Sequence, residues 1–225
     1  MKQSQCLRVR KEEGYVANRE SFSVPSPADG EVLIKSSFSS LNYKDALAVT
    51  GKGKILKSFP LIPGIDVAGV VVESHFDRIK VGQPVVVTGC GLGENRDGGY
   101  SEYVTVPGSW AIPLANGLSE KDAMIYGTAG FTAALAVYRF KANGQSPEQG
   151  PILVTGASGG VGSLAVSMLS KLGFSVHAVT GKPNWKPRLK DLGAEHVVSP
   201  DELQLGSRPL ESVKYGGAIE GKLRQ

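Results

Sequence analysis

Residues 151–162 constrain the fold of this chain more than any other segment. An apolar stretch, Pro151–Thr155, runs directly into a glycine-rich loop, Gly156–Gly162, which matches the dinucleotide-binding fingerprint with alanine in place of its first glycine. The residues that follow carry apolar side chains at helical spacing up to Leu172, and Gly173 is the predicted end of that helix. A strand, a glycine loop and an amphipathic helix in this order predict the start of a doubly wound parallel sheet.

The residues after this unit continue the alternation of strands and helices. We expect strands at Ser175–Thr180 and Glu195–Ser199, a short helix at Pro187–Leu192 between them, and a fourth strand that begins at Ala218. A complete dinucleotide-binding fold has about six strands, so this region predicts little more than its first half.

The residues before Pro113 predict a different kind of domain. Short apolar or alternating stretches follow turn signals such as Asp29-Gly30 and Pro63-Gly64. The expected strands are Glu31–Lys35, Asp66–Glu73, Gln83–Thr88 and Tyr100–Pro107. They indicate a mainly β domain, a barrel or a strongly bent sheet. A helix over Ala123–Phe140, interrupted near Gly127-Thr128, follows, and we place the domain boundary between residues 121 and 122.

Composition excludes several classes of protein. The 225 residues carry a net charge of +4 with no sustained basic run, which argues against a nucleic-acid partner. Two cysteines exclude a disulfide scaffold and a four-cysteine zinc site. No stretch of about 18 apolar residues occurs, and the N-terminus does not resemble a signal peptide. We therefore expect a soluble cytoplasmic protein with a small-molecule partner and no membrane contact.

The glycine loop carries the candidate cofactor-binding residues. Ser158, Gly159, Gly160, Val161 and Gly162 would present backbone N–H groups and a positive helix end to a pyrophosphate. The alternative is a purely structural turn between the strand and the helix.

The end of the next strand indicates which cofactor binds. NAD sites place Asp or Glu there, whereas this chain has Thr180, Gly181 and Lys182. A hydroxyl and an ammonium group suit a 2′-phosphate, so the sequence predicts NADP(H). The alternative is a solvated basic face.

Three further segments, together with the glycine loop, carry a family resemblance. They are Ser40–Leu47 (SLNYKDAL), Pro60–Gly69 (PLIPGIDVAG) and Gly127–Ala133 (GTAGFTA). The chain resembles the medium-chain dehydrogenase/reductase superfamily, and within it the zinc-free quinone oxidoreductase branch and the acrylyl-CoA reductase family. The resemblance implies an α/β chain with a GroES-like β-barrel catalytic domain (residues 1–121), followed by part of a Rossmann-type NADP-binding domain (residues 122–225). It also implies a homodimer in full-length members.

The resemblance also indicates which chemistry to expect. Zinc alcohol dehydrogenases of this superfamily carry a cysteine ligand where this chain has Asn42, and Gly-His-Glu where it has Gly64-Ile65-Asp66. An isoleucine cannot bind zinc, so no metal is expected. Without a Lewis acid, the oxygen of a ketone is not readily polarised, whereas reduction of an activated C=C bond depends less on such polarisation. We therefore expect hydride transfer from NADPH to an acrylyl-CoA-like enoyl thioester or a quinone-like acceptor.

The resemblance points to Asn42, Tyr43 and Asp45 as catalytic residues beside the nicotinamide, with Tyr43 also binding the cofactor. Tyr43 would donate a proton or a hydrogen bond to the developing enolate, and Thr128 would contact the nicotinamide ribose or amide. The alternatives are a packed aromatic side chain at residue 43 and a helix-capping hydroxyl at residue 128.

The residues after Ile219 depart from the family pattern, in which the nucleotide sheet is completed and a C-terminal segment returns to the catalytic domain. From this departure we expect a chain of this extent to bind part of the cofactor and to turn over slowly. The alternatives to an active reductase are an inactive or regulatory fragment with partial nucleotide binding, and a structural, lens-crystallin-like use of the fold.

Overall fold

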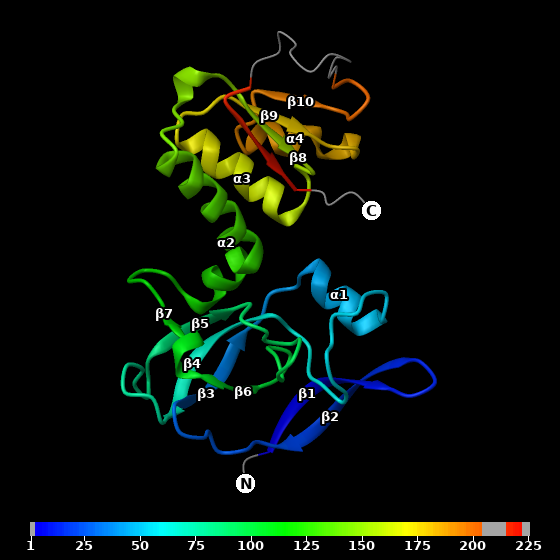
Figure 1. Ribbon diagram of the computed structural model, residues 1–225, viewed down its shortest axis with the longest axis vertical. Helices are drawn as coiled ribbons and strands as arrows, with labels where there is room; N and C mark the ends of the chain where they lie inside the picture. Colours follow the sequence, from blue (N-terminus) through cyan, green and yellow to red (C-terminus); the bar gives the residue numbers. More distant parts are fainter. Residues whose placement is uncertain (1–2, 204–214, 222–225) are drawn as a thin grey trace. The chain divides into compact units, whose positions relative to one another are not determined.

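The computed structural model describes residues 3–203 and 215–221 (Figure 1). The chain divides into two compact units, Met1–Thr128 and Ala129–Gln225. The division falls inside helix α2, Glu120–Ala142, at the residue after its non-helical Gly127. The interruption that the sequence predicted near Gly127-Thr128 is thus confirmed. The predicted domain boundary between residues 121 and 122 stays a prediction.

The first unit is built on a five-stranded antiparallel sheet in the order β6-β3-β4-β5-β7. Its strands are β3 (Glu31–Phe38), β4 (Asp66–Ser74), β5 (Pro84–Thr88), β6 (Tyr103–Pro107) and β7 (Ile112–Pro113). Alternating valine and isoleucine side chains of β3, β4 and β5 form the core beneath it. Two register shifts between β3 and β4 are irregularities of the kind that bend a sheet. The four strands expected from the sequence are present.

Several elements of the first unit were not predicted. A hairpin of β1 (Gln3–Lys11) and β2 (Tyr15–Ser23) is joined to the rest by bridges from Cys6 to Ser101 and from Val9 to Leu61. Helix α1 (Tyr43–Thr50) begins after Asn42 and ends at Gly51, which has a φ of 69°. A short 3₁₀ helix, η1 (Gly108–Trp110), precedes β7.

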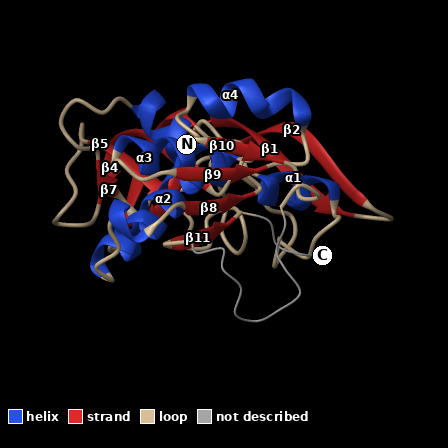
Figure 2. Ribbon diagram, turned by 90° about the horizontal axis from the view of Figure 1, so that it is seen from above, coloured by secondary structure: helices blue, strands red, loops and turns tan. Residues whose placement is uncertain are grey.

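The second unit contains a four-stranded parallel sheet in the order β10-β9-β8-β11 (Figure 2). In chain order the unit comprises the second half of α2, η2 (Pro147–Gln149), β8 (Ile152–Thr155), α3 (Gly160–Lys171), β9 (Val176–Val179), η3 (Pro183–Trp185), α4 (Lys186–Asp191), β10 (His196–Val198) and β11 (Gly217–Glu220). The first strand lies between the second and the fourth, which is the strand order of the doubly wound fold.

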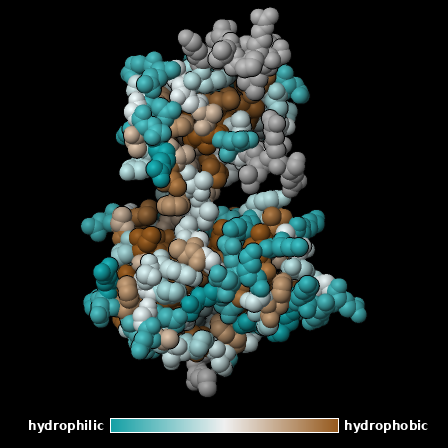
Figure 3. Space-filling view, in the orientation of Figure 1, coloured by the Kyte–Doolittle hydropathy of each residue, from teal (hydrophilic) through white to brown (hydrophobic). Residues whose placement is uncertain are grey.

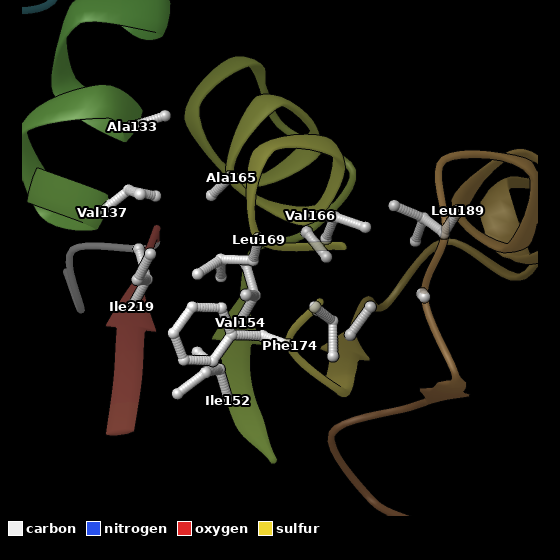
Figure 4. Close-up of a cluster of buried hydrophobic side chains, with 14 residues drawn as sticks. Ala133, Val137, Ile152, Val154, Ala165, Val166, Leu169, Phe174, Leu189 and Ile219 are labelled. Carbon is white, nitrogen blue, oxygen red and sulfur yellow. The ribbon is translucent and has the colours of Figure 1, made fainter. Parts of the chain in front are cut away.

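The core of this second unit lies between the sheet and its helices. Figure 4 shows α2, α3 and α4 on one side of the strands, with Ala133 and Val137 of α2 pointing toward α3 and Leu169 of α3 pointing toward the strands. Leu189 of α4 and Ile219 of β11 complete the same cluster. Gly173, the predicted helix end, has a φ of 86° and follows the last turn of α3.

Apolar side chains also lie on the surface of both units, where Figure 3 shows patches of brown between the hydrophilic residues. They include Leu41 and Tyr43 in the first unit and Phe131 and Tyr138 in the second. Within the described ranges, α2 and the other helices are too short or too polar to cross a lipid bilayer.

Candidate active site

A buried carboxylate, Asp66, is the centre of the polar cluster in the first unit. Asp66 is fully inaccessible to solvent at the start of β4. Its Oδ2 accepts hydrogen bonds from the Ser40 hydroxyl, from Asn42 Nδ2 at 2.9 Å and from the Thr128 backbone N–H at 2.9 Å. Its Oδ1 accepts from Thr128 Oγ1 at 2.6 Å. Asp66 therefore connects two predicted site residues, Asn42 and Thr128, although it was not itself predicted.

The break in α2 makes this arrangement possible. Gly127 has a φ of 50° and a ψ of −154°, and a Cβ there would lie 2.9 Å from Asp66 Oδ2. Only glycine fits a left-handed backbone that passes so close to a carboxylate. Thr128 then begins the second helical segment, and its backbone N–H donates to Asp66 in the manner of a helix cap.

Asp45 fixes the start of α1. Its side chain is buried, with Oδ2 accepting from the Asn42 N–H at 2.9 Å and Oδ1 accepting from the Ile65 N–H at 3.0 Å. Asn42 and Asp45 form the capping box of the helix. Both carboxylate oxygens of Asp45 thus hold backbone groups, and the helix is tied to the loop before Asp66.

Tyr43 differs from its neighbours because it is open to solvent. It is the first residue of α1, its side chain is 71% exposed, and its hydroxyl makes no hydrogen bond to any described residue. This exposure does not fit the alternative that Tyr43 is a packed aromatic side chain. Among Asn42, Tyr43 and Asp45, Tyr43 alone has an O–H donor to offer.

Tyr100 is a second tyrosine in the cluster, which the sequence reasoning missed. Its half-buried hydroxyl donates to the Ser40 carbonyl oxygen at 3.3 Å. Burial, followed by the nearby Asp45 carboxylate, raises the pKa of this phenol. Tyr100 therefore stays protonated and its O–H group is already in use.

The two positions that carry zinc ligands in zinc alcohol dehydrogenases do not offer a ligand pair here. The Asn42 amide is held by Ser40 and Asp66, and Ile65 is a buried hydrocarbon side chain. Over residues 3–203 and 215–221, His, Cys, Asp and Glu side chains do not gather in groups of three suited to a metal ion. Zinc independence stays a prediction for measurement.

The glycine loop of the second unit lies between β8 and α3. The Ala157 N–H donates to the Val179 carbonyl at 3.0 Å, and Gly159 is the N-cap of α3 with no side-chain cap. A Cβ on Gly162 would lie 2.5 Å from the Gly156 carbonyl oxygen, so the loop closes tightly against the first turn. The Gly159 N–H donates to the Gly156 carbonyl at 2.8 Å, and the first bond into the helix runs from Ser163 N–H to Gly159 O. Within the described residues, the N–H groups of Gly160, Val161 and Gly162 remain available for an anion.

The end of β9 is connected to this loop through Thr180. Its hydroxyl, on a buried residue, donates to Ser158 Oγ at 2.9 Å and accepts from the Lys182 N–H at 3.1 Å. Gly181 and Lys182 are exposed. The Lys186 ammonium lies 3.4 Å from Glu202, whereas Lys182 has no acidic partner within the described part of the chain. The structure thus brings Ser158, Thr180 and Lys182 together.

Comparison with known proteins places this arrangement in a family. Residues 28–116 match the alcohol dehydrogenase GroES-like domain. The acrylyl-CoA reductase AcuI of Ruegeria pomeroyi is 45% identical over 85% of this chain and 58% of its own length. The crystal structure of Escherichia coli K-12 YhdH with bound NADPH has a TM-score of 0.90 and 47% identity, over 96% of this chain and 67% of that one. The Bacillus subtilis YhfP structure with NAD bound has a TM-score of 0.92 and 46% identity, over 97% and 67%.

This chain therefore spans about three fifths to two thirds of the length of these relatives. Both the GroES-like first unit and the Rossmann-type second unit of the predicted α/β fold are confirmed. The chain belongs to the medium-chain dehydrogenase/reductase superfamily, in the family that includes the quinone oxidoreductases and acrylyl-CoA reductases.

Proposed function

We propose that this chain binds NADP(H) and reduces the activated C=C bond of an enoyl thioester such as acrylyl-CoA, or a quinone-like acceptor, without zinc. The observation that carries the proposal is a helix N-terminus without a side-chain cap at Gly159–Gly162, together with Lys182 at the end of the next strand, which has no acidic partner among the described residues. Relatives crystallised with NADPH and NAD support it.

The residues of the glycine loop fit a dinucleotide. Gly160, Val161 and Gly162 would hold the pyrophosphate through their backbone N–H groups and the helix dipole, and Ser158 and Gly159 would shape the loop around it. Lys182, with Gly181 leaving space beside it, would pair with the 2′-phosphate, and Thr180 would keep Ser158 and the Lys182 backbone in place.

NADPH, when bound, supplies a hydride. The acceptor also needs a hydrogen-bond donor or a proton at its carbonyl oxygen, where negative charge develops. Tyr43 is the residue we assign to that task, because its hydroxyl is exposed and uncommitted. Asn42 and Thr128 would position the nicotinamide, and Asp45 would hold the segment that carries Asn42 and Tyr43.

Two measurements test the proposal. Fluorescence titration should show that NADPH binds, and a turnover assay with acrylyl-CoA and a benzoquinone should then show NADPH oxidation. Tyr43→Phe removes only the hydroxyl, so it should reduce turnover by roughly 10- to 100-fold with NADPH affinity unchanged. Binding without turnover on either acceptor would instead favour the alternative, a regulatory fragment that retains nucleotide binding.

A further inference from the structure

The hydrogen atoms around Asp66 can be assigned one by one, because its carboxylate oxygens are the acceptors in all four of its side-chain hydrogen bonds. Asn42 Nδ2 lies 2.8 Å from Ser40 Oγ and 2.9 Å from Asp66 Oδ2. Both amide hydrogens of Asn42 are therefore used, one on each partner. Ser40 accepts from Asn42 and donates its own hydrogen to Asp66.

The same reasoning applies to Thr128. Its hydroxyl lies 2.6 Å from Asp66 Oδ1 and must donate to it, so its hydrogen is committed as well. Asn42 keeps its carbonyl oxygen, Oδ1, which has two lone pairs, so it retains acceptor capacity beyond the capping box of α1.

We infer that Asp66 is a positioning residue that makes Asn42 a hydrogen-bond acceptor toward the ligand, which selects a ligand group that donates N–H. This inference rests on the proposed function, in which the group is the primary carboxamide of the nicotinamide ring. It follows that neither Asn42 nor Thr128 stabilises an oxyanion, and Tyr43 is left as the donor of this cluster.

Burial gives this orientation its strength. Asp66 is fully inaccessible to solvent, so a rotated Asn42 amide would place Oδ1 against a carboxylate with no water to replace the lost bond. A buried acceptor without its donor is costly, and two opposed oxygens add repulsion. Asp66→Asn removes this constraint because the new amide can itself donate to Asn42 Oδ1.

The test compares NADPH with its 3-acetylpyridine analogue, in which a methyl ketone replaces the carboxamide and no N–H remains. Dissociation constants are measured by fluorescence titration. The wild-type chain should prefer NADPH by about tenfold, the value of one hydrogen bond. The preference should fall to about twofold in Asp66→Asn and in Asn42→Leu, which removes the acceptor in a similar volume. Asp97→Asn is the matched control, because Asp97 also accepts a backbone N–H, from Ile62, in the first unit, and it should retain the wild-type preference.

A second readout needs neither ligand nor activity. The side-chain NH₂ resonances of Asn42, identified by their loss in Asn42→Leu, should exchange slowly with water in the wild-type chain and at least tenfold faster in Asp66→Asn. Equal affinity of the wild-type chain for the two nucleotides would overturn the inference and leave the proposed function standing. If NADPH does not bind at all, the proposed function fails. Rapid exchange of the Asn42 side-chain amide with water in the wild-type chain would overturn the inference, whatever the binding result. Thr128→Val, which removes one of the four hydrogen bonds to Asp66, replaces Asp66→Asn if that variant does not fold.

Discussion

The hydroxyl of Thr180 donates to Ser158 Oγ at 2.9 Å, and this bond joins the end of β9 to the glycine loop. The same hydroxyl accepts from the Lys182 N–H, so one buried side chain orders both the segment we assign to the pyrophosphate and the segment we assign to the 2′-phosphate. Because its hydrogen is used on Ser158, Thr180 would support the proposed phosphate-binding residues rather than donate to a phosphate itself.

Lys182 is therefore the residue to test for cofactor choice. NADPH should bind more tightly than NADH by about 1–3 kcal/mol, because a lysine–phosphate hydrogen bond is charge-assisted. Lys182→Ala should remove most of this preference in a fluorescence titration with both nucleotides. Lys171→Ala, an exposed lysine in the last turn of α3, is the control and should leave it unchanged. Equal affinities for NADH and NADPH in the wild-type chain would contradict the assignment.

Gly162 should tolerate no side chain. In Gly162→Ala the new Cβ would lie 2.5 Å from the Gly156 carbonyl oxygen and 2.7 Å from Ala157 Cα, so the backbone must move. We expect a loss of about 1–3 kcal/mol in the free energy of unfolding, measured by urea denaturation. In Gly181→Ala, by contrast, the Cβ meets nothing within 4 Å, and stability should stay the same or rise by up to about 1 kcal/mol. Similar losses in both variants would show that the loop is not tightly closed.

The parts of the fold that the sequence predicted are those with a strong local pattern. Buried strands such as Ile152–Thr155 and the apolar face of α3 follow from periodicity alone, and Gly173 follows from its helix-ending role. The hairpin of β1 and β2 was missed because charged residues such as Arg8 and Arg10 interrupt its apolar pattern. Arg10 pairs there with Glu20 across the hairpin, a contact that the pattern of neither strand alone indicates.

The candidate site was predicted only in part, because some of its contacts join segments that are far apart in the sequence. Asn42, Tyr43 and Asp45 came from a family resemblance, but the spacing of Asn42 and Asp45 also matches a capping box, which would have indicated α1. In the sequence, Asp66 stands out only as the residue that replaces the glutamate of the Gly-His-Glu motif of zinc alcohol dehydrogenases. Its importance depends on donors from Ser40, Asn42 and Thr128, which only the folded chain brings together.

Metal content is a direct test of the zinc-free assignment. Elemental analysis of the purified chain should find no stoichiometric zinc, because Ile65 cannot be a ligand and the Asn42 amide is engaged by Ser40 and Asp66. Treatment with a chelator should leave NADPH binding and any turnover unchanged. One zinc per chain, or loss of binding after chelation, would refute this.

The stability of the second unit should depend on pH through His177. Burial, followed by the neighbouring His196, lowers the pKa of His177 below its ordinary value of about 6.5. The centroid of its ring lies 4.7 Å from that of His196 and 5.6 Å from that of Tyr215. The Glu195 carboxylate acts in the opposite direction and raises the pKa of His177. Between the pKa of folded His177 and the ordinary pKa of about 6.5 in the unfolded chain, the unfolded chain therefore binds a proton more readily than the folded one.

It follows that the free energy of unfolding should be largest above pH 6.5 and should fall as the solution is acidified through the pKa of folded His177, with no further contribution below it. Urea denaturation at pH 7.5, 6.5 and 5.5 measures this dependence. His177→Gln should flatten it, because glutamine does not titrate. His75→Gln, which replaces a histidine that faces Glu73 in the first unit, should leave it as in the wild-type chain. An unchanged slope in His177→Gln would mean that other groups, not His177, set the acid sensitivity of this unit.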